Sequence, residues 1–205
     1  PKSWTGVQVL GVTSPAWLRH VGLPETSEPE MQDGGIVMAL PTSEEDLSTI
    51  LKRIEALIAS HDSPAALALC QALIDEELTR RAGLRARADV YASMRLRDLQ
   101  IVDLERLVEL GDWEPADRFH LGIAQWRDGR IGDAALSFLR AVEMGEAARF
   151  GYYTDASRMH LAGILIQLGK KEEALEHCRL VADGYACYLP GGVRTKEQLM
   201  GEAGP

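Results

Sequence analysis

The pattern of apolar residues at 116–145 constrains the fold of this chain more than any other feature. Phe119, Ile123 and Trp126 recur at spacings of four and three, which places them on one face of a helix. An Asp-Gly pair at 128–129 interrupts this pattern, because glycine readily adopts the left-handed backbone that ends a helix. A second apolar face then follows, formed by Ala134, Ala135, Phe138, Ala141 and Val142. The stretch therefore predicts two helices joined by a tight turn.

The same hairpin pattern recurs along the chain. The run Leu-Val-Glu-Leu-Gly at 107–111 lies 34 residues before Ala-Val-Glu-Met-Gly at 141–145. Equivalent positions in four successive second helices are separated by 33, 35 and 40 residues, and they are Ala66, Leu99, Ala134 and Ala174. Four such hairpins are enough to bury a continuous core, since a repeat array needs about three. We therefore expect an array of helical hairpins.

Several details of these hairpins are expected from the spacing alone. The second helix of the second hairpin is expected to bury Leu99, Val102, Leu104, Leu107 and Val108. Cys70 and Cys178 fall on buried helix faces, where a free cysteine acts as a small apolar residue. Gly145 is expected to end its helix. The six extra residues of the last spacing fall at 145–153, as either a contact surface or a longer helix with aromatic packing.

These residues resemble the tetratricopeptide repeat family. Leu121-Gly122 and the pair Ala134 and Phe138, four residues apart, match its pattern, whereas Arg118 and Gln125 replace its Trp and Tyr. The resemblance covers residues 44–184 and is most specific in the third and fourth hairpins. It implies an all-α, right-handed solenoid of about four helix-turn-helix repeats. We expect a non-repeat segment at 1–42, the repeats at 43–184, and a tail with a short capping helix at 185–205.

The segment at 1–42 differs from the remainder of the chain. Two short β-branched runs at 5–12 and 35–40 flank a polar, proline-bearing stretch, which suggests a small β-hairpin or a cap. Thr42 and Glu45 form a capping-box pattern that predicts a helix start. The chain begins at Pro1 without Met, which favours a piece of a longer protein.

Composition and motifs disfavour several classes of function. The net charge of −9 disfavours nucleic-acid binding, and no apolar run is long enough for a membrane span. Three cysteines favour a reducing, cytoplasmic location. No phosphate loop, serine elbow or metal-ligand cluster is present, so we predict no enzyme activity, catalytic residue, metal or cofactor. His120 and His160 occupy equivalent places, and packing is the favoured interpretation for both.

The resemblance implies a function in binding another protein. In this family the first helices line a concave groove, so we expect an adaptor, chaperone or assembly factor that holds an apolar peptide or helix. Chaperone-binding members clamp a terminal carboxylate with Lys, Asn and Arg, but this chain contains no Asn. The expected binding residues are Leu84, Tyr91, Phe119, Ile123, Trp126, Arg127, Met159 and Ile166. A second contact is expected at Arg149, Phe150, Tyr152 and Tyr153.

Three alternatives stay open at this stage. The segment at 1–42 fills the groove, or the repeats pack against a missing domain of a longer enzyme or regulator. In the third alternative, the chain senses a small molecule that binds between His120, His160 and Trp126. The sequence does not determine the oligomeric state.

Overall fold

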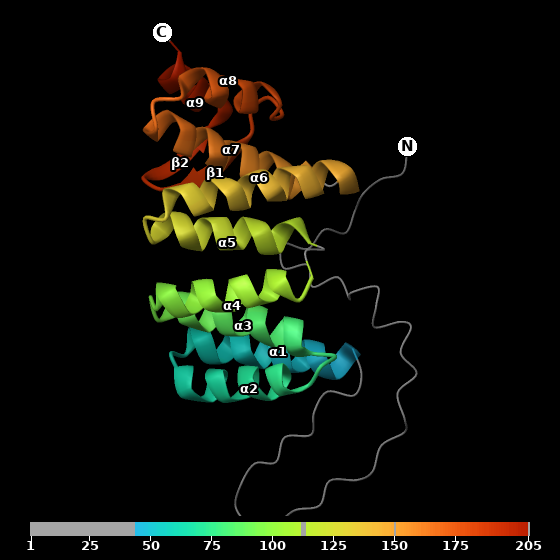
Figure 1. Cartoon of the computed structure of the whole chain (residues 1–205). Helices are drawn as coiled ribbons and strands as arrows, with labels where there is room; N and C mark the ends of the chain where they lie inside the picture. Colours follow the sequence, from blue (N-terminus) through green and yellow to red (C-terminus); the bar gives the residue numbers. More distant parts are fainter. Residues whose placement is uncertain (1–43, 112–113, 150, 205) are drawn as a thin grey trace, which may run out of the picture. The chain divides into compact units, whose positions relative to one another are not determined.

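The computed structural model of the chain describes residues 44–111, 114–149 and 151–204. Its helices follow one another as four hairpins (Figure 1), which are α1 (Glu44–Ala59) with α2 (Ser63–Asp75), α3 (Arg80–Ser93) with α4 (Arg97–Glu109), α5 (Pro115–Arg127) with α6 (Ile131–Ala148), and α7 (Gly151–Gln167) with α8 (Lys171–Arg179). A tail of β1 (Ala186–Leu189), β2 (Gly192–Thr195) and α9 (Lys196–Ala203) follows them. This confirms the predicted all-α repeat fold. The expectations for residues 1–42 and for the Thr42 cap lie outside the described residues.

The chain divides into two compact units within α3, after Ala86. In the first unit, α1 and α2 pack together around Ile54, Leu73 and the predicted buried thiol of Cys70. Gly83 allows the start of α3 to approach α2 closely, because a Cβ added there would lie 2.8 Å from the backbone nitrogen of Ile74. No larger residue fits at this position without moving the backbone of α2.

In the second unit, α4 to α8 pack in sequence order, each helix against the next. The core is centred on Phe138 of α6, whose side chain is fully buried. Gly122 of α5 faces this ring, and a Cβ there would lie 2.8 Å from Phe138 Cε1. The Leu-Gly pair of the repeat pattern is therefore required here because a large ring fills the space beside it.

The buried face of α4 agrees with the prediction only in part. Leu104, Leu107 and Val108 are buried as expected, whereas Leu99 and Val102 are exposed. Ile101 and Asp103 complete the buried face in their place. Asp103 is buried because Arg87 on α3 pairs with both of its carboxylate oxygens, each at 2.7 Å. A charge pair that is buried and fully hydrogen-bonded fixes which face of the helix turns inward.

The extra residues near Gly145 lengthen two helices. Gly145 does not end α6, as the sequence suggested, but lies buried within it, and α6 continues to Ala148. Arg149 then ends the helix with a left-handed backbone, at φ 55°. Helix α7 begins at Gly151 and is also longer than α5. The described residues of 145–153 therefore lengthen α6 and α7, as one interpretation expected, and their role as a contact surface stays a prediction.

The tail contains a β-hairpin that the sequence did not predict. Strands β1 and β2 pair antiparallel, with Ala186 opposite Thr195. Thr195 and Gln198 then form a capping box that starts α9, in agreement with the expected short helix. Lys196 fixes this helix to the end of α8, since its Nζ donates to Val181 O at 2.7 Å and to Asp183 at 2.6 Å. Helix α9 packs against α7 and α8 and covers the last hairpin.

Candidate functional site

The candidate site of the second unit is the face formed by α5, α7 and β1. Gly163 on α7 marks the close approach of these elements. A Cβ added there would lie 3.0 Å from Trp126 on α5 and 3.4 Å from Leu189 on β1. The C-terminal hairpin therefore covers part of the surface that the first helices of the repeats form. The binding surface that is left lies around the edges of this hairpin.

The predicted binding residues are distributed unevenly over buried and accessible positions. Leu84 is buried in the first unit. Tyr91 belongs to the second unit and is half-buried, and Arg87 Cζ lies 5.9 Å from the centroid of its ring. Trp126 and Met159 are buried in the core of the second unit, so they support the face from beneath. The remaining predicted residues are accessible there, with half-buried side chains at Phe119, Ile123 and Ile166 and an exposed one at Arg127.

The predicted second contact lies at one end of this face. Arg149 and Tyr152 are exposed, and Tyr153 is half-buried. Phe150 lies outside the described residues. The ring centroids of Tyr153 and Phe119 are 5.4 Å apart, so this end is continuous with the aromatic residues of α5. Its role in contacting a partner stays a prediction.

An aromatic cluster extends from the core to this surface. Phe119 lies in contact with Phe138 in the core, at 5.8 Å between ring centroids, and with His160, at 5.1 Å. It also contacts His120 at 5.7 Å. Phe119 thus contacts both histidines, and the binding of a small molecule between His120, His160 and Trp126 stays a prediction.

A small cavity of about 80 Å³ opens on the same face. Its lining comes from three elements far apart in the sequence, namely Ile123, Trp126 and Arg127 of α5, His160 of α7, and Tyr188, Leu189 and Pro190 of the hairpin. The three hairpin residues were not predicted as part of a site, because the sequence at 185–194 was expected to be a tail without strands. The strand pattern Cys-Tyr-Leu before Pro-Gly-Gly was the available signal.

His160 is the buried polar group of this cavity. Its Nδ1 lies 2.7 Å from the Ala156 carbonyl oxygen, and its Nε2 is buried. Burial lowers the pKa of His160 to about 4, against the opposing effects of the Ala156 and Tyr188 backbone, and the positive charge of Arg127 lowers it further. The imidazole is therefore neutral at physiological pH.

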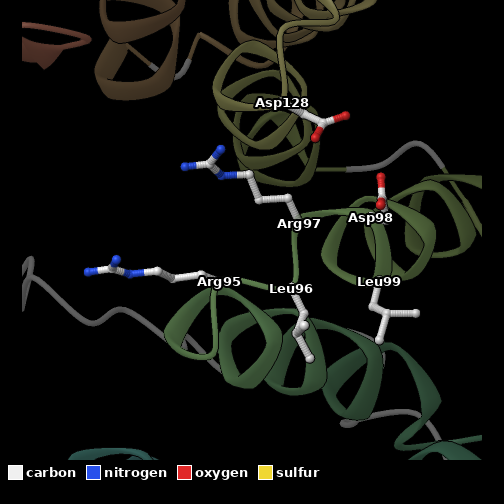
Figure 2. A pocket seen from close by; sticks show the side chains of 6 residues that line it. All are labelled: Arg95, Leu96, Arg97, Asp98, Leu99 and Asp128. Carbon is white, nitrogen blue, oxygen red and sulfur yellow. The ribbon is translucent and has the colours of Figure 1, made fainter.

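A second hollow, of about 460 Å³, lies at the turn between α3 and α4 (Figure 2). In this view, Leu96 and Leu99 point away from Asp128. Arg130 joins Asp98 and Asp128 through contacts at 3.2 and 2.8 Å. This open hollow, whose rim carries exposed charges, was not predicted, and nothing in it indicates a ligand.

The chemistry of the described residues is limited. Within 44–111, 114–149 and 151–204, no three His, Cys, Asp or Glu side chains are placed to hold a metal ion. In the same ranges, no helix has both the length and the apolar character needed to cross a membrane. Cys187 is half-buried, and burial raises the pKa of its thiol to about 11, so it is a weak nucleophile at neutral pH.

Comparison with known proteins identifies the fold. No protein-family model matches this sequence, and no curated protein matches it either. Among solved structures, the type III secretion translocator chaperone SycD of Yersinia enterocolitica superposes with a TM-score of 0.53 at 20% identity, over 68% of this chain and 97% of that chain. MamA of Desulfovibrio magneticus RS-1, from residue 41 onward, gives 0.52 at 16% identity, over 65% and 72%.

A third similar structure is a putative kinesin light chain of Podosopora anserina with nearly identical TPR-like repeats. It has a TM-score of 0.55 at 15% identity, over 68% of this chain and 78% of that chain. At such low identity these likenesses establish the fold alone.

Proposed function

Since the chain has the tetratricopeptide-like repeat fold, we propose that it is a non-enzymatic protein-binding module and that the face of α5, α7 and β1 binds a peptide or helix of its partner. One of the similar proteins, SycD, is described as a translocator chaperone, which supports a role in holding another protein. The repeat fold supplies surfaces rather than reacting groups.

The observation that carries this proposal is the aromatic cluster that continues from the core to the surface. Phe119 and Ile123 remain half-buried although they border a fully buried core, and Tyr188, which lines the same cavity as Ile123, is exposed. Aromatic and apolar groups that are rigidly backed by a core lose little entropy on binding, and they are typical of interface hot spots. Arg127 adds a positive charge at the edge of this surface.

The hairpin restricts which partner fits. Leu189 and Trp126 both lie against Gly163, and the accessible side chains near them are Phe119 with Tyr153 on one side and Arg127 with Tyr188 on the other. A short segment that crosses these two sides fits this surface better than a large flat partner. We therefore place the peptide contacts at Phe119, Ile123, Arg127 and Tyr153.

Site-specific photo-crosslinking tests this assignment. A benzoylphenylalanine side chain replaces Ile123 or Tyr188 on the proposed face, and Leu136 in the control. Leu136 is exposed on α6 and lines a different hollow, beside Val108 and Ser137. We expect the first two chains to capture one common protein from a lysate of the source organism, and the Leu136 chain to miss it.

The other outcomes are equally informative. Capture from Leu136 but not from Ile123 or Tyr188 would place the partner on the other surface and contradict the proposal. Capture from none of the three positions would favour the alternative in which this face packs against a further domain of the same protein. Circular dichroism of the three chains checks that each remains helical.

A further inference from the structure

The hollow at the turn between α3 and α4 offers nothing to a small ligand, but the charged groups on its rim belong to a longer surface. Each of the three hairpin turns of the second unit carries basic residues that are exposed. They are Arg95 and Arg97 between α3 and α4, Arg127 and Arg130 between α5 and α6, and Lys170 and Lys171 between α7 and α8. We call these residues the basic edge. It belongs to a chain whose net charge is −9.

Two contacts place the three turns side by side. Arg130 at the second turn donates to Asp98, near the start of α4, at 3.2 Å. Trp126 near the end of α5 donates to Gln167 at the end of α7, at 3.3 Å, and α5 also packs against α7. Since packed helices lie about 8–10 Å apart, the edge runs about 16–20 Å from the first turn to the third. It is therefore a short row of positive charges.

Most of this charge is not neutralised within the unit. The acidic residues at the turns, Asp98 and Asp128, both pair with Arg130. Lys170 pairs with Glu173, and both side chains are exposed. The other four basic side chains of the edge form no ion pair with any residue of 44–111, 114–149 or 151–204. The edge is therefore open to a negatively charged group from outside.

Arg95 occupies a backbone position that favours glycine. Its φ is 60°, in the left-handed region, and the equivalent positions of the other two turns are Gly129 and Gly169, with φ of 84° and 74°. An arginine in this conformation costs free energy that a glycine would not. Its guanidinium extends to the same side as that of Arg97, away from Asp98 (Figure 2). A residue kept at such a cost points to a role of its side chain beyond the fold of the turn.

Two other cations of the edge also lie where local structure disfavours them. Arg97 and Lys171 are the first residues of α4 and α8, and the positive end of a helix dipole repels a cation. The same dipoles add to the positive potential of the edge. An anion bound here would therefore be stabilised both by the side chains and by the helix ends.

We propose that the basic edge binds an acidic, extended segment of a partner protein. Such a segment advances about 3.3 Å per residue, so about five or six residues reach across the three turns. Carboxylates at alternate positions lie on one face of the segment, where the arginines of the edge pair with them in bidentate geometry. The inference goes beyond the proposed binding face, which shares only Arg127 with the edge.

An anionic membrane has the same sign of charge but fits the edge less well. Glu172 and Glu173 are exposed in the first turn of α8, next to Lys170 and Lys171. A flat bilayer that approached these lysines would also lie within about one Debye length, about 8 Å, of the two carboxylates. A single extended chain contacts the cations while leaving the carboxylates in solvent.

The test uses an eight-residue peptide of alternating Glu and Ser, with a peptide of alternating Gln and Ser as its uncharged counterpart. Fluorescence anisotropy of the labelled peptides measures their binding to the native chain. We expect the Glu peptide to bind about ten times more tightly at low salt, as several exposed ion pairs together provide. The difference should shrink with added salt, because salt screens exposed charges.

Two double variants locate the site at the turns. Arg95→Gly with Arg97→Gln removes the charge of the first turn, and Lys170→Gln with Lys171→Gln removes that of the third. Each should weaken binding of the Glu peptide by about threefold or more. Arg95→Gly alone should leave the thermal midpoint unchanged or raise it, because glycine adopts the left-handed turn more readily. Weaker binding in this variant is then not a loss of fold.

A third double variant is the control for net charge. Arg106→Gln with Arg179→Gln removes two exposed arginines that lie near the C-terminal ends of α4 and α8, away from the turns. It changes the net charge by the same amount as the other two variants. Its affinity for the Glu peptide should stay within about twofold of that of the native chain, because charges beyond a Debye length are screened.

Three results would overturn the inference. They are equal binding of the Glu and Gln peptides, equal weakening by the control variant, and binding to phosphatidylserine vesicles without binding to the Glu peptide. The last result would assign the edge to a membrane. The crosslinking positions Ile123 and Tyr188 lie outside the edge, so failure of the edge and failure of the binding face are distinguishable.

Discussion

The third and fourth hairpins differ in the sizes of the side chains at equivalent buried positions of their two helices. In the third, Gly122 on α5 lies against the ring of Phe138 on α6. In the fourth, the equivalent positions, each 40 residues later, carry Ala162 on α7 and Cys178 on α8. Ala162, Phe138 and Cys178 are fully buried. The third hairpin has the smaller residue on its first helix (Gly122 against Ala162) and the larger one on its second (Phe138 against Cys178). Such compensation in volume is what a close-packed interior requires.

The difference in size between Phe138 and Cys178 goes with a difference in the residues that surround them. The ring of Phe138 attracts other rings, with Trp126 at 6.3 Å and His160 at 5.0 Å between centroids. The smaller Cys178 belongs to the same core, next to the tail, which contributes Val181 and Leu199. The third hairpin therefore supplies the aromatic support of the candidate site, while the fourth depends on α9 to complete its core.

The largest expected effect is a difference in the loss of stability between a substitution in α6 and one in α8. Phe138→Ala should destabilise the second unit by about 3–5 kcal/mol, because it removes a buried ring and leaves a cavity. Cys178→Ala should cost about 1 kcal/mol, since it removes one atom of a small side chain. Chemical denaturation of both variants, followed by circular dichroism, measures the difference. Equal losses would show that the two positions are not energetically distinct.

Acid should act on the fourth hairpin through His160. Burial holds the pKa of this residue at about 4 in the folded chain, against about 6.5 when it is unfolded. Between these values only the unfolded chain takes up the proton, so stability is complete above about pH 6.5. It falls as the pH drops toward 4, by up to about 3 kcal/mol.

Denaturation midpoints across this pH range measure the effect, and His160→Phe serves as the control. The pKa of His177 is also lowered, by burial and by Arg158, so a smaller slope should persist in that variant. An unchanged slope in His160→Phe would contradict the assignment of the acid sensitivity to this residue.

The smallest expected changes in stability come from substitutions on the first helices, α5 and α7. Gly122→Ala should destabilise by about 1–3 kcal/mol because the new methyl group meets Phe138. Ala162→Gly should cost about 1 kcal/mol, from helix propensity alone. In a Phe138→Leu background the penalty at Gly122 should largely disappear, and a double-mutant cycle measures this coupling. Additive effects would show that the ring is not what requires a glycine here.

Much of the fold was predictable because the repeat pattern is local. The spacing of Phe119, Ile123 and Trp126 fixes a helix, and the turn glycine at 129 ends it with φ 84°. The face of α4 was not predictable in this way. Leu99 and Val102 are as apolar as Ile101 and Leu104, so periodicity alone permits two rotations of the helix. The choice depends on Arg87 reaching Asp103, which is a tertiary contact.

In the candidate site, too, local features were predictable and those that depend on tertiary contacts were not. Residues of α5 were correctly placed on one helix face, since a helix face follows from sequence spacing. Burial of Trp126 and Met159 was not foreseen, because the element that covers this part of the face comes from the other end of the unit. The cavity lining at Tyr188 and Leu189 also depends on how β1 is placed against α7.

The sequence by itself determined the helices, their hairpin order and the repeat fold, because these depend on apolar spacing, turn residues and caps within a few positions of one another. Only the tertiary structure decided which apolar faces stay accessible and that the His160 imidazole is buried. Those properties depend on which distant segments cover a surface, as β1 lies against α7, and no periodic pattern in the chain predicts that contact.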